Sequence, residues 1–317
     1  MRGLGFMALV AGLMVSASAQ RVIISEAMVN PPGSPDAGRE FVEIQSCRPS
    51  QSLQGVWLIG IDGEFIFNPG NIHWAIDLSS YSTGSNGLLL VRDSSLVLLD
   101  APAPETTVVV IPDAFTPASM GNDSYTVALV RGFTGQPGDD IDTNDDGVVD
   151  NPLWTEVLDA FAWLDGDDAP GARDQIYTFG VGTEVTTASR TESNGNVWEP
   201  DAIIFFSFDQ ANWIAADVGR VVAGQDQGPF QTSTSRLVVN GSLPSGYNRL
   251  VTPGNLNQGM RAPQAGDVNC DGCVDDADLL QVLFAFGGSD ADSDVNSDGI
   301  VDDADLLIVL FNFGSGC

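Results

Sequence analysis

Residues 267–287 read DVNCDGCVDDADLLQVLFAFG, and residues 294–314 repeat this stretch as DVNSDGIVDDADLLIVLFNFG. The copies begin 27 residues apart (294 minus 267), and 17 of their 21 aligned positions are identical. Each copy consists of an acidic loop followed by a short apolar segment. One such loop could arise by chance in an acidic chain, but two complete copies indicate a module with a specific function.

Both copies place oxygen-bearing side chains at positions 1, 3, 5, 9 and 12 of a loop, with glycine at position 6. This is the spacing of an EF-hand calcium loop, in which alternate side chains point at one ion and glycine permits a sharp turn. Position 7 supplies only its carbonyl, so its side chain is free to be apolar. The alternative is a pair of solvated acidic turns. The predicted calcium ligands are Asp267, Asn269, Asp271, Cys273, Asp275 and Asp278 in the first loop, and Asp294, Asn296, Asp298, Ile300, Asp302 and Asp305 in the second.

The charge of the tail agrees with this interpretation. Residues 266–317 contain 12 Asp and no Lys or Arg. Repulsion among the eight predicted carboxylate ligands opposes folding, so divalent cations should stabilise the tail. The apolar segments predict two helices of under three turns, which end near Gly287 and Gly314. Helices this short must pack against each other to be stable.

The whole chain is strongly acidic. Its 317 residues carry a formal net charge of −31, and all 12 basic residues are arginine. Nucleic acid and acidic membranes are therefore poor partners. The start, MRGLGFMALVAGLMVSASAQ, predicts a secretory signal peptide over residues 1–19. Its apolar run is too short to span a bilayer, so we expect no membrane span in the mature protein and a secreted, extracellular or cell-surface location.

Residues 20–258 predict a β domain. Short β-branched or alternating segments are separated by turn-forming clusters, and no regular alternation of helix and strand appears. This pattern favours an antiparallel sandwich. Residues 152–165 fit either a helix or a strand and are a candidate helix. Residues 259–266 are the predicted linker to the tail, residues 267–317. The predicted strands are 21–29, 40–44, 56–61, 87–93 and 124–132.

A third acidic loop, DTNDDGVVD, lies inside the β domain at residues 142–150. Position 12 is Leu153, so a carboxylate is missing there or is supplied by Glu156, Asp159 or Asp139. We expect calcium binding weaker than in the tail, against the alternative of an Asp/Gly turn. The predicted ligands are Asp142, Asn144, Asp146, Val148 and Asp150.

Catalytic side chains are scarce. There is one histidine, His73, and no lysine, so Ser/His/Asp, Cys/His and multi-histidine metal chemistry lack their parts. Carboxylate chemistry of the glycosidase kind remains, with Glu26, Glu40 and Glu43 on predicted strands. Glu40 and Glu43 should lie on opposite faces of their strand. The expectation is a protein that is not an enzyme.

The tail resembles a bacterial type I dockerin, through its two loops each followed by one helix and its Asp at position 12. The resemblance implies a secreted, calcium-dependent all-α module that docks into a cohesin-like protein. Recognition in that family runs largely through loop positions 10 and 11 and the adjoining helix. These are Asp276, Ala277, Asp303 and Ala304, and because the pairs are identical either copy could face the partner. Dockerin helices often carry basic residues and this tail has none, so anchoring to a cell-surface protein is the alternative.

The β domain resembles the lamin tail domain of secreted bacterial proteins. The motifs that carry the likeness are VIISEAMVNPPGSPDAGREFVEI, SLQGVWLIGIDG, GSNGLLLV, DTNDDGVVD and TPGNLNQG. The resemblance implies an immunoglobulin-like β-sandwich that serves as an adhesive or accessory module. The resulting hypothesis is a secreted, non-enzymatic adhesion or assembly protein. The alternative is a secreted carboxylate hydrolase or carbohydrate-binding protein anchored by the same tail.

Four cysteines remain to be paired in an exported chain. Cys270 and Cys273 have zinc-like spacing, but no second pair or histidine accompanies them. Three complete pairings exist, and the sequence does not choose among them. In dockerins the two ends of the module lie close together, which implies a bond from Cys317 to Cys270 or Cys273. Cys270 is the preferred partner, because loop position 4 points away from the metal.

Overall fold

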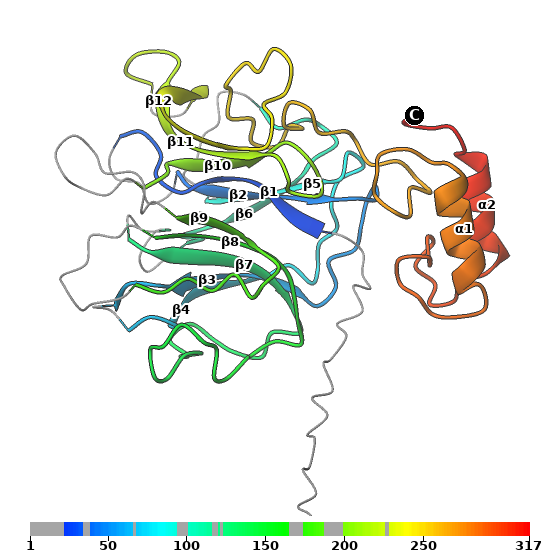
Figure 1. Ribbon diagram of the computed structural model, residues 1–317, viewed down its shortest axis with the longest axis horizontal. Helices are drawn as coiled ribbons and strands as arrows, with labels where there is room; N and C mark the ends of the chain where they lie inside the picture. Colours follow the sequence, from blue (N-terminus) through cyan, green and yellow to red (C-terminus); the bar gives the residue numbers. More distant parts are fainter. Residues whose placement is uncertain are drawn as a thin grey trace, which may run out of the picture.

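The protein is described here from a computed structural model, which covers residues 22–33, 39–65, 68–93, 101–115, 120, 123–164, 174–186, 199–225 and 228–317. Over these residues the fold is mainly β, with two helices at the C-terminal end (Figure 1). The predicted signal peptide lies outside the described residues.

The strands form two sheets. The larger sheet has the order β12-β11-β10-β1-β2-β5-β6, and the smaller has the order β4-β3-β7-β8-β9. Neighbours are antiparallel, except that β5–β6 and β8–β9 are parallel. The strands are β1 Val22–Met28, β2 Phe41–Ser46, β3 Val56–Asp62, β4 Ile72–Asp77, β5 Leu88–Asp93, β6 Thr107–Ile111, β7 Tyr125–Arg131, β8 Glu156–Leu164, β9 Thr183–Thr186, β10 Ala202–Phe205, β11 Trp213–Arg220 and β12 Phe230–Asn240.

The two sheets pack face to face around a central core. Ile24, Val42 and Phe205 of the larger sheet join Leu58 and Trp163 of the smaller one in this core. A second apolar cluster covers the outer face of the larger sheet, and a third covers the outer face of the smaller sheet. Strands buried on both faces explain why the sequence showed apolar runs more often than clean alternation. The prediction of a β-sandwich is confirmed, as are the five predicted strands.

The candidate helix at residues 152–165 is wrong. Most of this segment is strand β8, which pairs with β7 and β9. Phe161 and Trp163 are buried in the central core, while Ala160 is buried in the outer cluster of the smaller sheet. With both faces apolar, the alternation that marks a strand was lost.

The tail contains helices α1 (Asp276–Ala285) and α2 (Asp303–Phe311), as the repeat predicted. They lie side by side, apart from the sandwich (Figure 1). Five valines make the small core between the two copies. Backbone bonds also cross between the copies: the N–H of Val301 donates to Gly288 at 2.9 Å, and that of Val274 donates to Ser315 at 2.9 Å. Each loop is thereby closed against the end of the other copy's helix.

Two disulfides link the tail internally and to the β domain. Cys273 is bonded to Cys317, and Cys47 is bonded to Cys270. Cys317 is therefore bonded within the first loop as expected, but the preference for Cys270 was wrong. That preference ignored Cys47, whose position directly after β2 brings it to the first loop. The tail is thus covalently fixed to the β domain.

The predicted linker, residues 259–266, lies against both parts of the molecule. Gln45 of β2 donates to the carbonyl of Arg261 at 3.1 Å, and the Arg261 side chain donates to Gly316 at 2.7 Å. The segment therefore contributes contacts at the junction as well as connecting the two parts.

Candidate metal loops and docking surface

The three acidic loops share one backbone conformation. At position 4, Asp145, Cys270 and Ser297 have φ of 56°, 65° and 61°. At position 6 the three glycines have φ between 81° and 95°. Left-handed φ at position 4 is uncommon for residues other than glycine, so the agreement of three separate loops indicates a specific shape.

The loops also share their internal hydrogen bonds. The glycine N–H at position 6 donates to the position 1 carboxylate at 2.7 Å in residues 142–150, 2.9 Å in the first tail loop and 2.7 Å in the second. The N–H at position 7 donates to the position 5 carboxylate at 2.9, 2.9 and 3.0 Å respectively. The side chains at positions 1 and 5 therefore turn inward, onto the backbone of their own loop.

The position 1 carboxylates are buried. Asp142, Asp267 and Asp294 are 0%, 3% and 7% exposed. The Oδ1 atom of Asp267 is buried without a hydrogen-bond partner. Burial raises the pKa of Asp267 to about 6, and repulsion from Asp278 and Asp271 adds to the rise, against the bond from Gly272. A cation beside this oxygen would relieve both the missing contact and the repulsion, so the residues of the first loop fit a bound ion.

Positions 9 and 12 of the tail loops have a structural role as well. Asp275 is the N-cap of α1 and accepts from the N–H of Ala277 at 2.8 Å. Asp278 completes a capping box by accepting from the N–H of Asp275 at 2.8 Å. Asp302 and Asp305 repeat this arrangement at α2. The same carboxylates therefore start the helices whether or not they bind an ion.

The third loop differs in its surroundings. Leu153, at position 12, packs in the outer apolar cluster of the smaller sheet. Tyr177 donates to Oδ2 of Asp142 at 2.9 Å, a contact that the sequence gave no sign of. Burial and this bond raise the pKa of the tyrosine. The carboxylates considered as replacements have other contacts: Glu156 is paired with Arg131, and Asp159 accepts from the N–H of Ile24 in β1.

Within the described part of the chain, no cluster of three or more His, Cys, Asp or Glu side chains is arranged to hold a metal ion. Each predicted ligand set contains at least three aspartates beside its asparagine and backbone carbonyl. These carboxylates are therefore not gathered around one point in this structure. The carboxylates meanwhile accept hydrogen bonds from the loop backbone.

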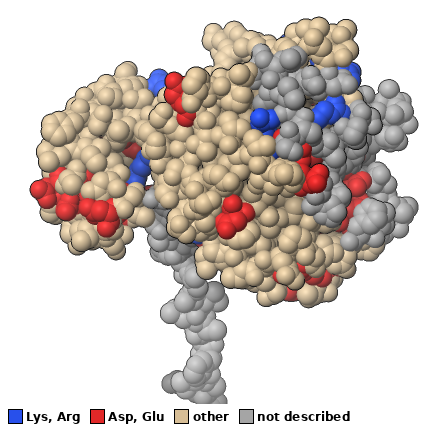
Figure 2. All heavy atoms as spheres, turned by 180° about the vertical axis from the view of Figure 1, so that it is seen from behind, with Lys and Arg blue, Asp and Glu red and all other residues tan. Residues whose placement is uncertain are grey.

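The tail exposes a paired apolar and acidic surface. Phe284 of α1 is 86% exposed, and its counterpart Phe311 of α2 is 83% exposed. Acidic side chains gather along one edge of the tail (Figure 2). A groove of about 470 Å³ on the first copy is lined by Leu280, Phe284 and Asp290, among others. The predicted recognition residues Asp276, Ala277, Asp303 and Ala304 are all exposed.

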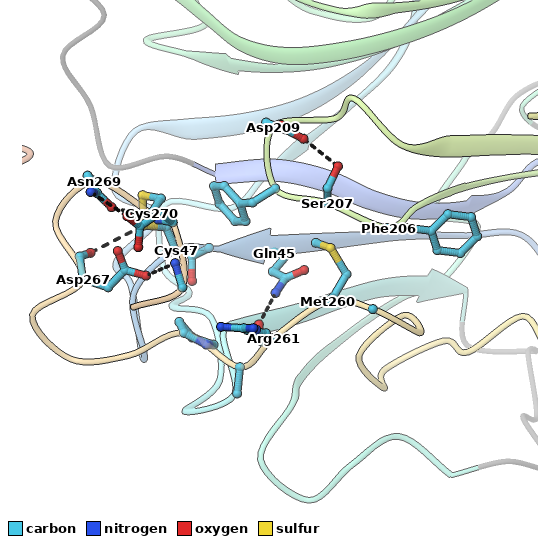
Figure 3. A pocket seen from close by; sticks show the side chains of 17 residues that line it. Gln45, Cys47, Phe206, Ser207, Asp209, Met260, Arg261, Asp267, Asn269 and Cys270 are labelled. Carbon is cyan, nitrogen blue, oxygen red and sulfur yellow. Dashed lines mark hydrogen bonds between the residues drawn. A yellow bond between two sulfur atoms is a disulfide. The ribbon is translucent and has the colours of Figure 1, made fainter. Parts of the chain in front are cut away.

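A cavity of about 510 Å³ opens at the junction between tail and β domain (Figure 3). Asp267, Asn269 and Asp271 of the first loop line one side, and Gln45 and Met260 are among the residues that line the rest. Solvent ions can therefore reach the first loop from this cavity.

The candidate catalytic glutamates are buried. Glu26 and Glu43 lie opposite each other on β1 and β2, and both are 0% exposed. Glu40, at 1% exposed, accepts from the N–H of Met120. His73 lies 3.0 Å from Oδ2 of Asp62. Buried carboxylates bonded to the protein itself are placed to hold the fold together.

The chain matches no protein-family model, and searches of curated proteins and of solved structures also gave no match. The fold and the site define a β-sandwich that is joined by a disulfide to a tail of two acidic loops, each followed by a helix. In addition, none of the described helices is long and apolar enough to cross a membrane.

Proposed function

We propose that the protein is a secreted, non-enzymatic adhesion or assembly protein, whose tail binds two calcium ions and docks a partner protein. Residues 142–150 bind a third ion more weakly. The observation that carries the proposal is the common shape of the three loops, with equivalent left-handed positions and equivalent carboxylate contacts. EF-hand loops use this alternation of side chains to surround calcium.

Docking is supported by the surface of the tail. Phe284 and Phe311 are the most exposed large apolar side chains among the described residues, and they occupy matching positions of two helices. Such a pair is typical of an interaction site. The acidic tail should attract a partner with basic side chains. A cohesin-like or cell-surface protein is the proposed class of partner. The burial of Glu26, Glu40 and Glu43 does not support the hydrolase alternative.

Titration calorimetry on the exported, oxidised chain tests calcium binding. We expect two tighter sites and one weaker site, because Leu153 replaces the last carboxylate of the third loop. Asp271→Asn and Asp298→Asn should each weaken one tail site. Asp276→Asn and Asp303→Asn are matched controls, since they remove the same charge from exposed positions outside the ligand set. Absence of binding at millimolar calcium would favour the acidic turns.

A recombinant type I cohesin domain is a direct probe of docking. Binding should occur in calcium, disappear with a chelator, and fall about tenfold or more in Phe284→Ser/Phe311→Ser, because buried aromatic anchors dominate interfaces. Leu243→Ser, at another exposed apolar position, is the control. Equal binding by all three proteins would contradict the role of the helix face.

A further inference from the structure

Arg48 of the β domain contacts the start of the second acidic loop. It follows Cys47, just after β2, and is only 7% exposed. Its guanidinium donates to the backbone carbonyls of Asp294 at 3.0 Å and Ala291 at 3.4 Å. It also donates to the carbonyl of Asp292. One side chain therefore fixes the backbone over residues 291–294, and Asp294 is position 1 of the loop.

The contact is charged as well as directional. Burial lowers the pKa of Arg48, whereas the charges of Asp292, Asp294, Asp305 and Asp290 oppose that change. A buried guanidinium is costly unless its donors are satisfied and opposite charges are near. Here the acidic loop provides both. The arginine in turn brings positive charge to a group of carboxylates that would otherwise repel one another.

The two nearly identical loops are therefore held by different means. The first is joined to the β domain by the Cys47–Cys270 disulfide. The second has Ser297 where the first has Cys270, so no equivalent bond can form. Arg48, the residue after Cys47, joins the second loop to the β domain instead. Residues 47 and 48 together hold both copies of the repeat.

We propose that Arg48 is a positioning residue for the second loop, and that it keeps this loop folded onto the β domain when no divalent cation is bound. The proposal rests on the proposed calcium function in one respect, because calcium is the ion that would otherwise hold this loop. From charge alone, both tail loops were expected to need a divalent cation to fold. The second copy should instead keep its structure without calcium, because the guanidinium of Arg48 already places a positive charge beside it.

Hydrogen exchange of the full oxidised chain, followed over residues 290–305 in a chelator, tests the proposal. The native chain should be protected there. Arg48→Gln should exchange about tenfold faster or more, since hydrogen bonds to a charged group are lost. Arg48→Lys should lie between them, because lysine keeps the charge but not the planar donor set. Millimolar calcium should restore protection in Arg48→Gln.

Arg261→Gln is the matched control, because Arg261 also donates to a tail carbonyl but from an exposed position. It should leave residues 290–305 unchanged. All six tryptophans precede the tail, so their emission reports whether a variant's β domain has folded. Native protection in Arg48→Gln, or an unprotected second loop in the native chain under chelation, overturns the proposal. If calcium fails to bind or to restore protection, the calcium function fails, while faster exchange in the chelator still supports Arg48.

Discussion

At the scale of single residues, the most unusual feature is the buried pair Glu26 and Glu43. Thr252 makes two short contacts through one hydroxyl, to Glu26 Oε2 at 3.1 Å and to Asn257 Oδ1 at 2.7 Å. The amide of Asn257 donates to two carbonyls, which fixes its oxygen as an acceptor. The single hydroxyl hydrogen of Thr252 is shared between these two acceptors, and the backbone N–H of Thr252 donates to Glu26 Oε1 at 2.9 Å. A buried carboxyl with one full and one shared hydrogen bond is poorly compensated as an anion.

Electrostatics favours the neutral form of Glu26. Burial raises the pKa of Glu26 to about 8, against the bonds from Thr252. Burial, and then repulsion from Glu26, raise the pKa of Glu43. A carboxyl whose pKa is higher in the folded state stabilises the fold fully below its unfolded pKa. That contribution is lost as pH rises through the folded pKa. Between about pH 4.5 and 8, Glu26 should therefore make the fold less stable as pH rises.

Glu26→Gln should flatten this pH dependence. The glutamine amide has nearly the shape of the carboxyl, and it does not ionise. Urea unfolding followed by tryptophan emission at pH 5 and pH 8 should show a smaller difference for the variant than for the native chain. The exposed Glu105→Gln is the control and should keep the native difference. An unchanged difference in Glu26→Gln would show that the acid is not neutral in the fold.

The turn conformation of the loops could be inferred from sequence far better than these partners could. Alternating Asp and Asn around a glycine is a local pattern, so its geometry follows from neighbouring residues. The contacts of Glu26 with Thr252 and of Arg48 with Asp294 join positions more than 200 apart in sequence. The sequence around either residue does not predict a partner so far along the chain.

At the scale of elements, the start of each tail helix serves two purposes. Asp278 is 0% exposed and accepts from the backbone N–H groups of Val268, Asn269 and Asp275. Asp271 is exposed and accepts within its own loop only. The two carboxylates belong to the same predicted calcium site, yet only one of them holds the helix.

Asp278→Ala should therefore destabilise α1 with and without calcium. The loss should be on the order of 1–2 kcal/mol, the range for removing a helix cap, because three N–H groups lose their acceptor. Asp271→Ala should affect α1 only when calcium is present. Hydrogen exchange over residues 276–285, with calcium and with a chelator, distinguishes the two. Equal behaviour of the variants would mean that capping is secondary to ion binding.

Half of the fourteen described elements were predicted from the sequence. Five strands and both helices follow from β-branched segments and from the repeat. Strand β8 was not predicted. Both of its faces are buried, so its sequence lacks the alternation of apolar and polar residues that distinguishes a strand from a helix. The short strands β9 and β10 lack enough residues to show a period at all.

At the scale of the whole molecule, the tail and the β domain form one connected structure. Strand β2 of the larger sheet ends at Ser46. The next two residues, Cys47 and Arg48, hold the two acidic loops of the tail. Residues 259–266 were predicted only to connect the two parts. The disulfide between residues 223 apart in sequence joins the same two parts a second time.

The last prediction concerns what each disulfide contributes. Residues 47 and 270 are 223 apart in sequence, and residues 273 and 317 are 44 apart. On the chain-entropy model these bonds contribute about 5 and about 4 kcal/mol respectively. Cys47→Ser/Cys270→Ser should therefore lower the unfolding free energy slightly more than Cys273→Ser/Cys317→Ser. It should also free the junction, so that trypsin cleaves after Arg261 and releases residues 262–317 faster than from the native chain, as seen on a reducing gel. The Cys273→Ser/Cys317→Ser chain keeps its link to the β domain and should be cleaved there more slowly. Cleavage after Arg261 at equal rates in the native chain and the Cys47→Ser/Cys270→Ser variant would show that the disulfide does not hold the junction closed.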